Sequence, residues 1–215
     1  MIGFFHLHPP KTAGTSLITS LMRHSDSFRQ NYGSLYKYSK FDHLHPITVD
    51  INLGSTVTLG VRNPYDRILS LTRWINKIKV YSTYYTAKKH LTEVRRHKKI
   101  NWQSRPKGIS HLPYKWTIQA TLCDWEDSLL DTCTVMPIRF EHFAEDVKTI
   151  YPDLPELPNI HRVTDPILFE HVRENFDSQE TLDKFNSIYA VDCERYNYIL
   201  IEHIDDFYQQ YQNNT

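Results

Sequence analysis

Short apolar runs alternate along the chain with polar loops and with longer amphipathic stretches. Three of the runs predict buried strands, at residues 2–7, 56–61 and 134–140. Each run is followed by apolar residues at helical spacing, as between Leu17 and Met22. This alternation predicts an α/β fold with a mainly parallel central sheet flanked by helices.

The same patterns predict further elements. Pro64 suits the first position of a helix, which the apolar spacing continues to Ile75. The four prolines between Tyr151 and Pro166 predict an extended loop. The remaining predicted helices are residues 84–99, Trp116–Leu122, Glu141–Ile150, and two or three helices between Leu168 and Tyr211.

Composition sets broad limits. With 215 residues the chain can bury a substantial core, so we expect a single domain over residues 1–215. It has no apolar run of membrane-spanning length and no signal-peptide pattern, so we expect a cytoplasmic protein without an anchor, of bacterial or viral type. The three cysteines predict small buried hydrophobes, and no metal-ligand spacing occurs.

The loop after the first strand is a candidate phosphate site. It has the sequence Lys11-Thr12-Ala13-Gly14-Thr15-Ser16. A helix that begins here directs backbone N–H groups and its positive dipole end at one point, and Lys11 adds a charge. The alternative is a polar turn in which Thr15 or Ser16 caps the helix. The loop lacks the Gly-Lys-Ser/Thr ending of a nucleotide-binding P-loop.

A second candidate anion site follows the strand at 56–61. Arg62 stands at the strand end, and Arg67 and Ser70 lie three residues apart on the predicted helix, so they are neighbours. Arg62 and Ser70 can reach the same anion. The alternatives are that Arg62 forms an ion pair that closes the turn, and that Arg67 pairs with an acidic group and only holds the loop.

Together these two stretches resemble the sulfotransferases that use 3′-phosphoadenosine-5′-phosphosulfate (PAPS). The first resembles the 5′-phosphosulfate loop of that family, and residues 62–70 resemble its 3′-phosphate motif, Arg-x-Pro-x-x-Arg-x-x-Ser. The carbohydrate sulfotransferases, including the heparan and chondroitin 2-O type, are the most similar. Weaker matches are Arg139-Phe140-Glu141 at the end of a late strand, the Pro-rich loop Leu157–Arg162, and Tyr189–Asp192 in a closing helix.

The resemblance implies a P-loop-like sulfotransferase fold, PAPS as cofactor and no metal. It implies that Lys11 is catalytic, and that His45, or His43 two residues earlier, is the catalytic base. Structural roles for both histidines are the alternative. The implied cofactor-binding residues are Lys11, Thr12, Ala13, Gly14, Thr15, Ser16, Arg62, Ser70 and Arg162.

Residues 77–115 are strongly basic and contain a single acidic residue, Glu93. Such a segment can dock a polyanion through counterion release, although a solvated helix face is the alternative. We expect it to be an acceptor-binding insertion for a glycan, possibly an anionic one, rather than for nucleic acid. The candidate acceptor-binding residues are Lys88, Lys89, Arg95 and Arg96.

The expected function is therefore transfer of a sulfuryl group from PAPS to a hydroxyl, with a carbohydrate as the expected acceptor. One rival is a P-loop nucleotide kinase, which predicts ATP binding with magnesium and is disfavoured by the missing Gly-Lys-Ser/Thr. The other rival is a non-enzymatic polyanion-binding module. A degenerate sulfotransferase that still binds nucleotide lies between the two.

Overall fold

A computed structural model describes residues 4–7, 9, 14–24, 26, 55–78, 83–97, 121–127, 133–155 and 167–212. The chain divides into two compact units. Unit 1 comprises Met1–Arg62, Pro106–Ile118 and Leu122–Arg162, and unit 2 comprises Asn63–Arg105, Gln119–Thr121 and Val163–Thr215. Each unit is described by itself, and the expectation of a single domain stays a prediction.

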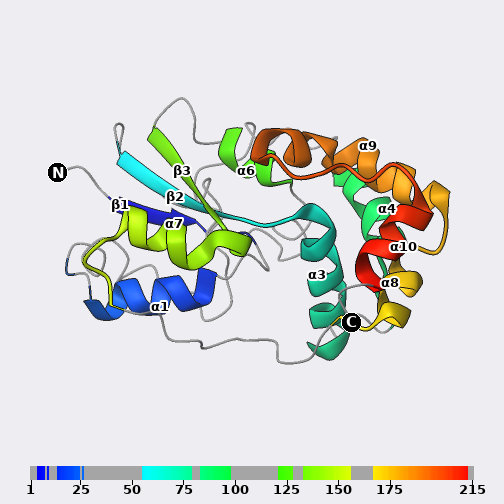
Figure 1. Ribbon diagram of the computed structural model, residues 1–215, viewed down its shortest axis with the longest axis horizontal. Coiled ribbons are helices and arrows are strands. Elements are labelled where there is room, and N and C mark those ends of the chain that lie inside the picture. The colour runs from blue at the N-terminus through cyan, green and yellow to red at the C-terminus, as the bar shows by residue number, and fades with distance from the viewer. Residues whose placement is uncertain are drawn as a thin grey trace. The chain divides into compact units, whose positions relative to one another are not determined.

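Unit 1 is built on a parallel sheet. Its strands are β1 (Phe4–Leu7), β2 (Ser55–Val61) and β3 (Cys133–Arg139), with β2 in the middle (Figure 1). Both pairings are parallel, and Leu7 is opposite Leu59 while Val61 is opposite Arg139. The three predicted strands and their parallel arrangement are confirmed, with each boundary within two residues of the prediction wherever the structure describes it.

Helices lie beside the outer strands. The helix α1 (Gly14–His24) lies beside β1, and α7 (Phe143–Ile150) lies beside β3 (Figure 1). The predicted apolar face of α1 is buried, with Leu17, Ile18 and Leu21 at most 2% exposed. Because α1 begins at Gly14, Thr15 and Ser16 lie inside its first turn, and the alternative in which one of them is the N-cap is wrong.

The middle strand and β3 differ in how deeply they are buried. On the middle strand Val57, Leu59 and Val61 are all fully buried, as expected for a strand with neighbours on both sides. On β3 the exposed Pro137 is tolerated because this strand is hydrogen-bonded to β2 alone among the described strands. After β3 the chain forms a 3₁₀ turn, η3 (Phe140–His142), before α7.

A short helix, α6 (Leu122–Asp127), also belongs to unit 1. The sequence predicts a helix over Trp116–Leu122, but Thr121 is not helical and α6 begins at Leu122. Leu122 and Cys123 are buried. The buried pair is therefore at the start of the helix and not near its end, and the rest of the predicted helix lies outside the described residues.

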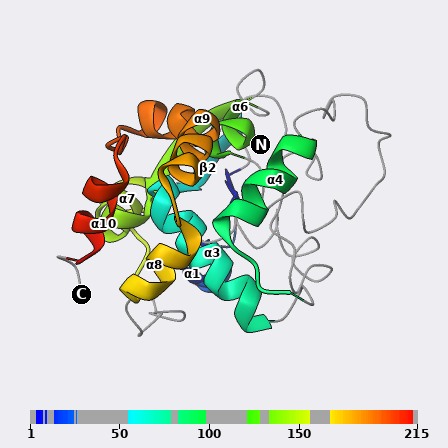
Figure 2. The same ribbon diagram turned by 90° about the vertical axis from the view of Figure 1, so that its right-hand side faces the viewer.

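Unit 2 is helical. It contains α3 (Pro64–Ile78), α4 (Ala87–His97), α8 (Phe169–Asn175), α9 (Gln179–Tyr196) and α10 (Ile204–Gln212). The helix α3 packs against α4, α8 and α9, while α4 packs against α9 and α10 against α8 (Figure 2). The helix start at Pro64 and the three helices after Leu168 are as predicted, and the helix expected over 84–99 is α4.

Aromatic rings fill the centre of unit 2. Tyr65, Phe176, Phe185 and Phe207 are each at most 1% exposed. The ring centroids of Phe176 and Phe207 are 4.5 Å apart, and those of Tyr65 and Phe185 are 4.9 Å apart, within the range of favourable aromatic contacts. Tyr65 belongs to the candidate 3′-phosphate motif, so part of that motif is core.

Local signals also fix the ends of α9. The Ser178 side chain accepts a hydrogen bond from the backbone N–H of Thr181, as an N-cap does. At the other end Asn197 adopts the left-handed conformation (φ 59°, ψ 41°), which asparagine tolerates better than most residues.

All three cysteines lie among the described residues, and none of them forms a disulfide. Cys123 and Cys193 are buried as predicted, whereas Cys133 on β3 is partly exposed. Among the helices that the structure describes, none combines the length and the apolar character that crossing a membrane requires.

Candidate functional site

The carboxyl edge of the sheet in unit 1 brings Arg62 and Phe140 together. Val61 is opposite Arg139 across the parallel strands, so the next residue of each strand lies at the same edge. The central carbon of the Arg62 guanidinium is 4.1 Å from the centroid of the Phe140 ring. In open α/β sheets this edge is where ligands bind.

This stacking suits an anion-binding arginine. A guanidinium that lies on an aromatic ring uses its face for the contact, while its N–H groups point outward in its own plane. Arg62 is partly exposed and 39% of Phe140 is exposed, so the site is accessible to solvent. Stacking on Phe140 restrains the orientation from which the Arg62 guanidinium can donate to a phosphate.

A strong ion pair holds the end of β3. Arg139 donates from Nε to Asp146 Oδ2 at 3.0 Å and from a terminal nitrogen to Oδ1 at 2.6 Å, and its backbone N–H also reaches Oδ2 at 2.8 Å. Burial alone would raise the pKa of Asp146, but the hydrogen bonds and charge of Arg139 outweigh it, so this pKa is lowered. The pair fixes the backbone directly before Phe140.

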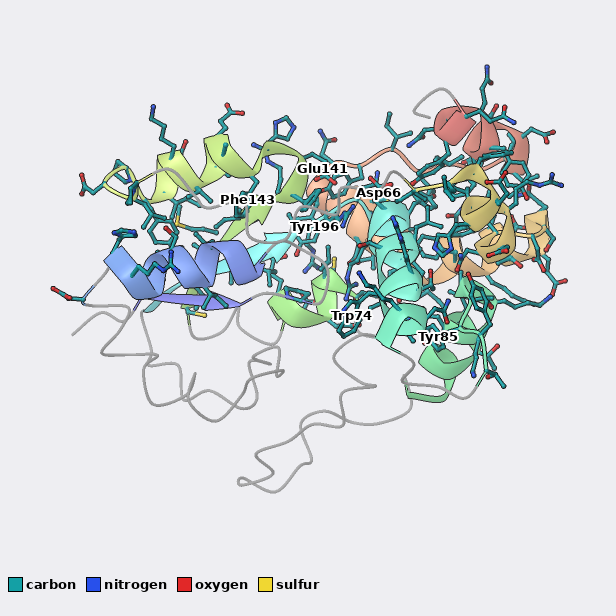
Figure 3. All side chains as sticks on the ribbon, turned by 90° about the horizontal axis from the view of Figure 1, so that it is seen from below. Asp66, Trp74, Tyr85, Glu141, Phe143 and Tyr196 are labelled. Atoms are coloured by element: carbon teal, nitrogen blue, oxygen red, sulfur yellow. The ribbon has the colours of Figure 1, made fainter. Side chains whose placement is uncertain are left out.

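Beyond Phe140 the chain turns into α7. Glu141 in η3 and Phe143 at the start of α7 are labelled in Figure 3. In the Arg139-Phe140-Glu141 step, Arg139 holds the end of β3 through Asp146, and the Phe140 ring stacks on Arg62. Glu141 is exposed.

In unit 2 the start of α3 accounts for several residues of the second motif. Asn63 caps the helix, because its Oδ1 accepts the backbone N–H of Tyr65 at 3.0 Å and its C=O accepts that of Arg67 at 2.9 Å. Pro64 occupies the first helical position, and Asp66 places a negative charge in the first turn, where the helix dipole favours it. These residues are explained by the helix start alone.

Arg67 lies in a buried polar cluster of unit 2. It is 3% exposed, and its charge acts on His90, a residue of α4 that is 1% exposed. Burial, reinforced by the charge of Arg67, lowers the pKa of His90 to about 3. The His90 ring nitrogens lie 3.1 Å from the Tyr85 hydroxyl and 2.7 Å from the Tyr189 hydroxyl.

The two arginines of the motif therefore differ in accessibility. Arg67 is buried, and this favours the hypothesis that it has a structural role. The conclusion depends on its burial and not on an ion pair with an acidic group. Ser70 is partly exposed on α3 and Arg62 is partly exposed at the end of β2. These two are the members of the motif that an anion can reach most readily.

The described part of the basic segment is mostly α4. Lys88 is exposed and lies 3.5 Å from the Asp177 carboxylate, and an exposed pair of this kind contributes little to stability. Lys89 donates to the Thr83 hydroxyl at 2.8 Å, with its nitrogen 5.8 Å from the centroid of the Tyr85 ring. The backbones of Arg95 and Arg96 belong to α4, and their side chains lie outside the description.

Several predicted site residues lie outside the described residues. The backbones of Gly14, Thr15 and Ser16 form the first turn of α1, and the side chains of Thr15 and Ser16 lie outside the description. Within the described ranges, no three side chains among His, Cys, Asp and Glu gather as a metal site would require. The site residues that the structure does not describe are Lys11, Thr12, Ala13, His43, His45 and Arg162.

Sequence reasoning missed the partner of Arg62. The sequence singles out Phe140 only through the family resemblance, and its position relative to Arg62 depends on the register between β2 and β3. The signal was present, because Arg62 directly follows the strand predicted at 56–61 and Phe140 is the last residue of the strand predicted at 134–140. Pairing the two strands by their ends would have placed them together.

Comparison with protein-family models, with curated proteins and with solved structures found no match to this chain. The case for a function therefore depends on its own residues and on the resemblance of its two motifs.

Proposed function

We propose that this protein is a PAPS-dependent sulfotransferase with a P-loop-like fold, which transfers a sulfuryl group to a hydroxyl of a carbohydrate. The observation that carries the proposal is Arg62, stacked on Phe140 at the carboxyl edge of a parallel sheet. Lys11 lies four residues after the last residue of the neighbouring parallel strand β1. Both candidate phosphate loops thus leave adjacent strands at one edge.

In the proposed reaction the acceptor oxygen forms a bond to sulfur, and the bond between sulfur and the phosphate oxygen breaks. His45, or His43, takes the proton from the acceptor hydroxyl. Lys11 and the N–H groups at the start of α1 stabilise the negative charge that develops on the leaving phosphate. The product is 3′-phosphoadenosine-5′-phosphate.

The binding roles follow the motifs. Residues Thr12–Ser16 hold the 5′-phosphate, and Arg62 with Ser70 binds the 3′-phosphate, with Arg162 as a further partner. The proposed reaction needs no metal, because these cations and hydrogen-bond donors act on the phosphates. The basic helix α4 offers Lys88, Lys89, Arg95 and Arg96 to an anionic glycan.

The test is calorimetric titration with 3′-phosphoadenosine-5′-phosphate, compared with ATP plus magnesium. Wild type should bind the bisphosphate without magnesium, and Arg62→Ala should weaken binding about 10- to 100-fold, the usual effect of losing a charge-assisted hydrogen bond. Arg23→Ala, which removes an exposed arginine of α1, is the matched control and should bind as wild type does. Equal affinities of wild type and Arg62→Ala would remove the main support for the proposal.

Turnover assays separate the catalytic roles, with desulfated heparan sulfate as acceptor and PAPS as donor. Lys11→Ala should lower kcat more than it changes the KM for the acceptor, because Lys11 acts on charge that develops in the transition state. His45→Ala should lower the rate and remove the fall in rate at acidic pH that protonation of the catalytic base causes. A full rate in His45→Ala would move the base to His43 or elsewhere.

The rival functions give different results in the same titrations. A preference for ATP with magnesium would favour a nucleotide kinase. A polyanion-binding module, which the exposed Lys88 favours, would bind neither nucleotide and would bind heparan sulfate with an affinity that falls steeply with salt. That binding would be indifferent to changes at Lys11 and Arg62.

A further inference from the structure

The first turn of α3 is hydrogen-bonded to the C-terminal segment of unit 2. The Tyr65 hydroxyl accepts the backbone N–H of Ile201 at 3.0 Å and donates to Asn186 Oδ1 at 2.8 Å. The Asn186 amide in turn donates to the C=O of Ile201 at 2.7 Å. Burial raises the pKa of Tyr65 to about 12, so this hydroxyl keeps the proton that it donates.

The next residue makes a second link to the same segment. The Tyr211 hydroxyl of α10 donates to Asp66 Oδ1 over 2.5 Å, and Tyr211 is 6% exposed. Asp66 lies in the first turn of α3, at the end of the helix opposite Trp74 (Figure 3). A short, shielded hydrogen bond to a carboxylate both fixes its position and reduces the negative potential around it.

Asp66 stands on the same face of α3 as Ser70. Residues four apart in a helix are neighbours, so the carboxylate lies one turn from the serine that we assign to the 3′-phosphate. A carboxylate so placed repels a phosphate unless it is directed elsewhere. The hydrogen bond from Tyr211 holds Asp66 toward α10.

We propose that Tyr211 is a positioning residue for anion binding at Ser70, because it holds the Asp66 carboxylate on the α10 side of α3. The inference rests on the proposed function and adds to it a role for the C-terminal helix. Binding of a 3′-phosphate then depends on α10 through the hydrogen bond between Tyr211 and Asp66.

The experiment compares two ligands and two tyrosines. The ligands are 3′-phosphoadenosine-5′-phosphate and adenosine 5′-monophosphate, which lacks the 3′-phosphate. Tyr211→Phe should lower the affinity for the bisphosphate about three- to tenfold and leave the affinity for the monophosphate unchanged. The control is Tyr208→Phe, which removes another hydroxyl of α10 that donates over 2.5 Å, in this case to the C=O of Phe176. It should leave the ratio of the two affinities unchanged.

A double variant tests the mechanism itself. In Tyr211→Phe the Asp66 carboxylate is no longer held toward α10. Adding Asp66→Asn removes its negative charge, so the affinity for the bisphosphate should return toward the wild-type value. If Tyr211→Phe does not fold, as thermal unfolding would show, Asp66→Asn alone is the second test. With Tyr211 in place it should leave the ratio of the two affinities close to the wild-type value, and a clear tightening of bisphosphate binding would overturn the positioning role.

The possible failures are distinct. The positioning role would be overturned if Tyr211→Phe lowered the affinity for both ligands to the same extent. It would also be overturned if Tyr211→Phe and Tyr208→Phe changed the ratio of the two affinities equally. The proposed function would stand in both cases. A wild-type protein that binds no bisphosphate would overturn the proposed function and this inference together.

Discussion

The fully buried His90 predicts that the protein loses stability in mild acid. In the folded chain the imidazole lies between the Tyr85 and Tyr189 hydroxyls, and burial with the charge of Arg67 lowers its pKa from 6.5 to about 3. Between these values the unfolded chain binds a proton that the folded chain does not. The free energy of unfolding therefore falls as the pH falls from about 6.5 toward 3.

The size of the effect follows from the same two pKa values. One pKa unit corresponds to about 1.4 kcal/mol, so His90 alone should lower the free energy of unfolding by about 2 kcal/mol between pH 7 and pH 5. This is a large part of the stability of a typical domain, about 5–15 kcal/mol. Burial also lowers the pKa of His171, which adds to the slope in wild type.

Urea unfolding at pH 7 and at pH 5 measures the effect, and the His90→Gln variant isolates it. The loss of stability between the two pH values should be about 2 kcal/mol smaller in His90→Gln than in wild type. Tyr189→Phe is the control, because it removes a hydrogen-bond partner and keeps the imidazole. It should be less stable at pH 7 and keep the wild-type dependence on pH. If stability fell as much between pH 7 and pH 5 in His90→Gln as in wild type, the pH effect would not come from His90.

Three further predictions concern the supports of the fold. Asp146→Asn should cost about 1–2 kcal/mol in urea unfolding, because it weakens the paired hydrogen bonds from Arg139; an unchanged midpoint would contradict this. Asn76→Ala should cost about 2 kcal/mol, because the Asn76 side chain bonds both the N–H and the C=O of buried Tyr85, at 2.7 and 2.9 Å; wild-type stability would refute it. Burial raises the pKa of Cys193 to about 12, so an aromatic disulfide reagent should label this thiol in urea and not in the folded protein, and rapid labelling without urea would show that it is accessible.

The regular elements were predictable because local signals and burial agree. The apolar run before Arg62 became the fully buried middle strand, and the Asn63-Pro64 pair began a helix where cap and proline preferences place one. The weakest prediction was the helix expected over Trp116–Leu122, where α6 instead begins at Leu122. Apolar spacing there indicated that residues are buried, and it did not fix where the helix starts.

Contacts between distant segments do not follow from any local pattern in the sequence. Phe140 reaches Arg62 through the register of two strands, and Tyr211 reaches Asp66 from a helix near the end of the chain. Neither pair has a local pattern, because each depends on how separate elements pack.

The second motif shows why a short motif must be taken apart residue by residue. Its Asn, Pro and Asp are what any helix with a well-formed start favours, and Arg67 is buried with the polar cluster around His90. A likeness that depended on these residues alone would say only that a helix follows a strand. The argument for an anion site rests on Arg62 and Ser70, which the helix start does not require. For this reason Arg62→Ala, which leaves the helix start intact, is the substitution that separates an anion site from a capped helix.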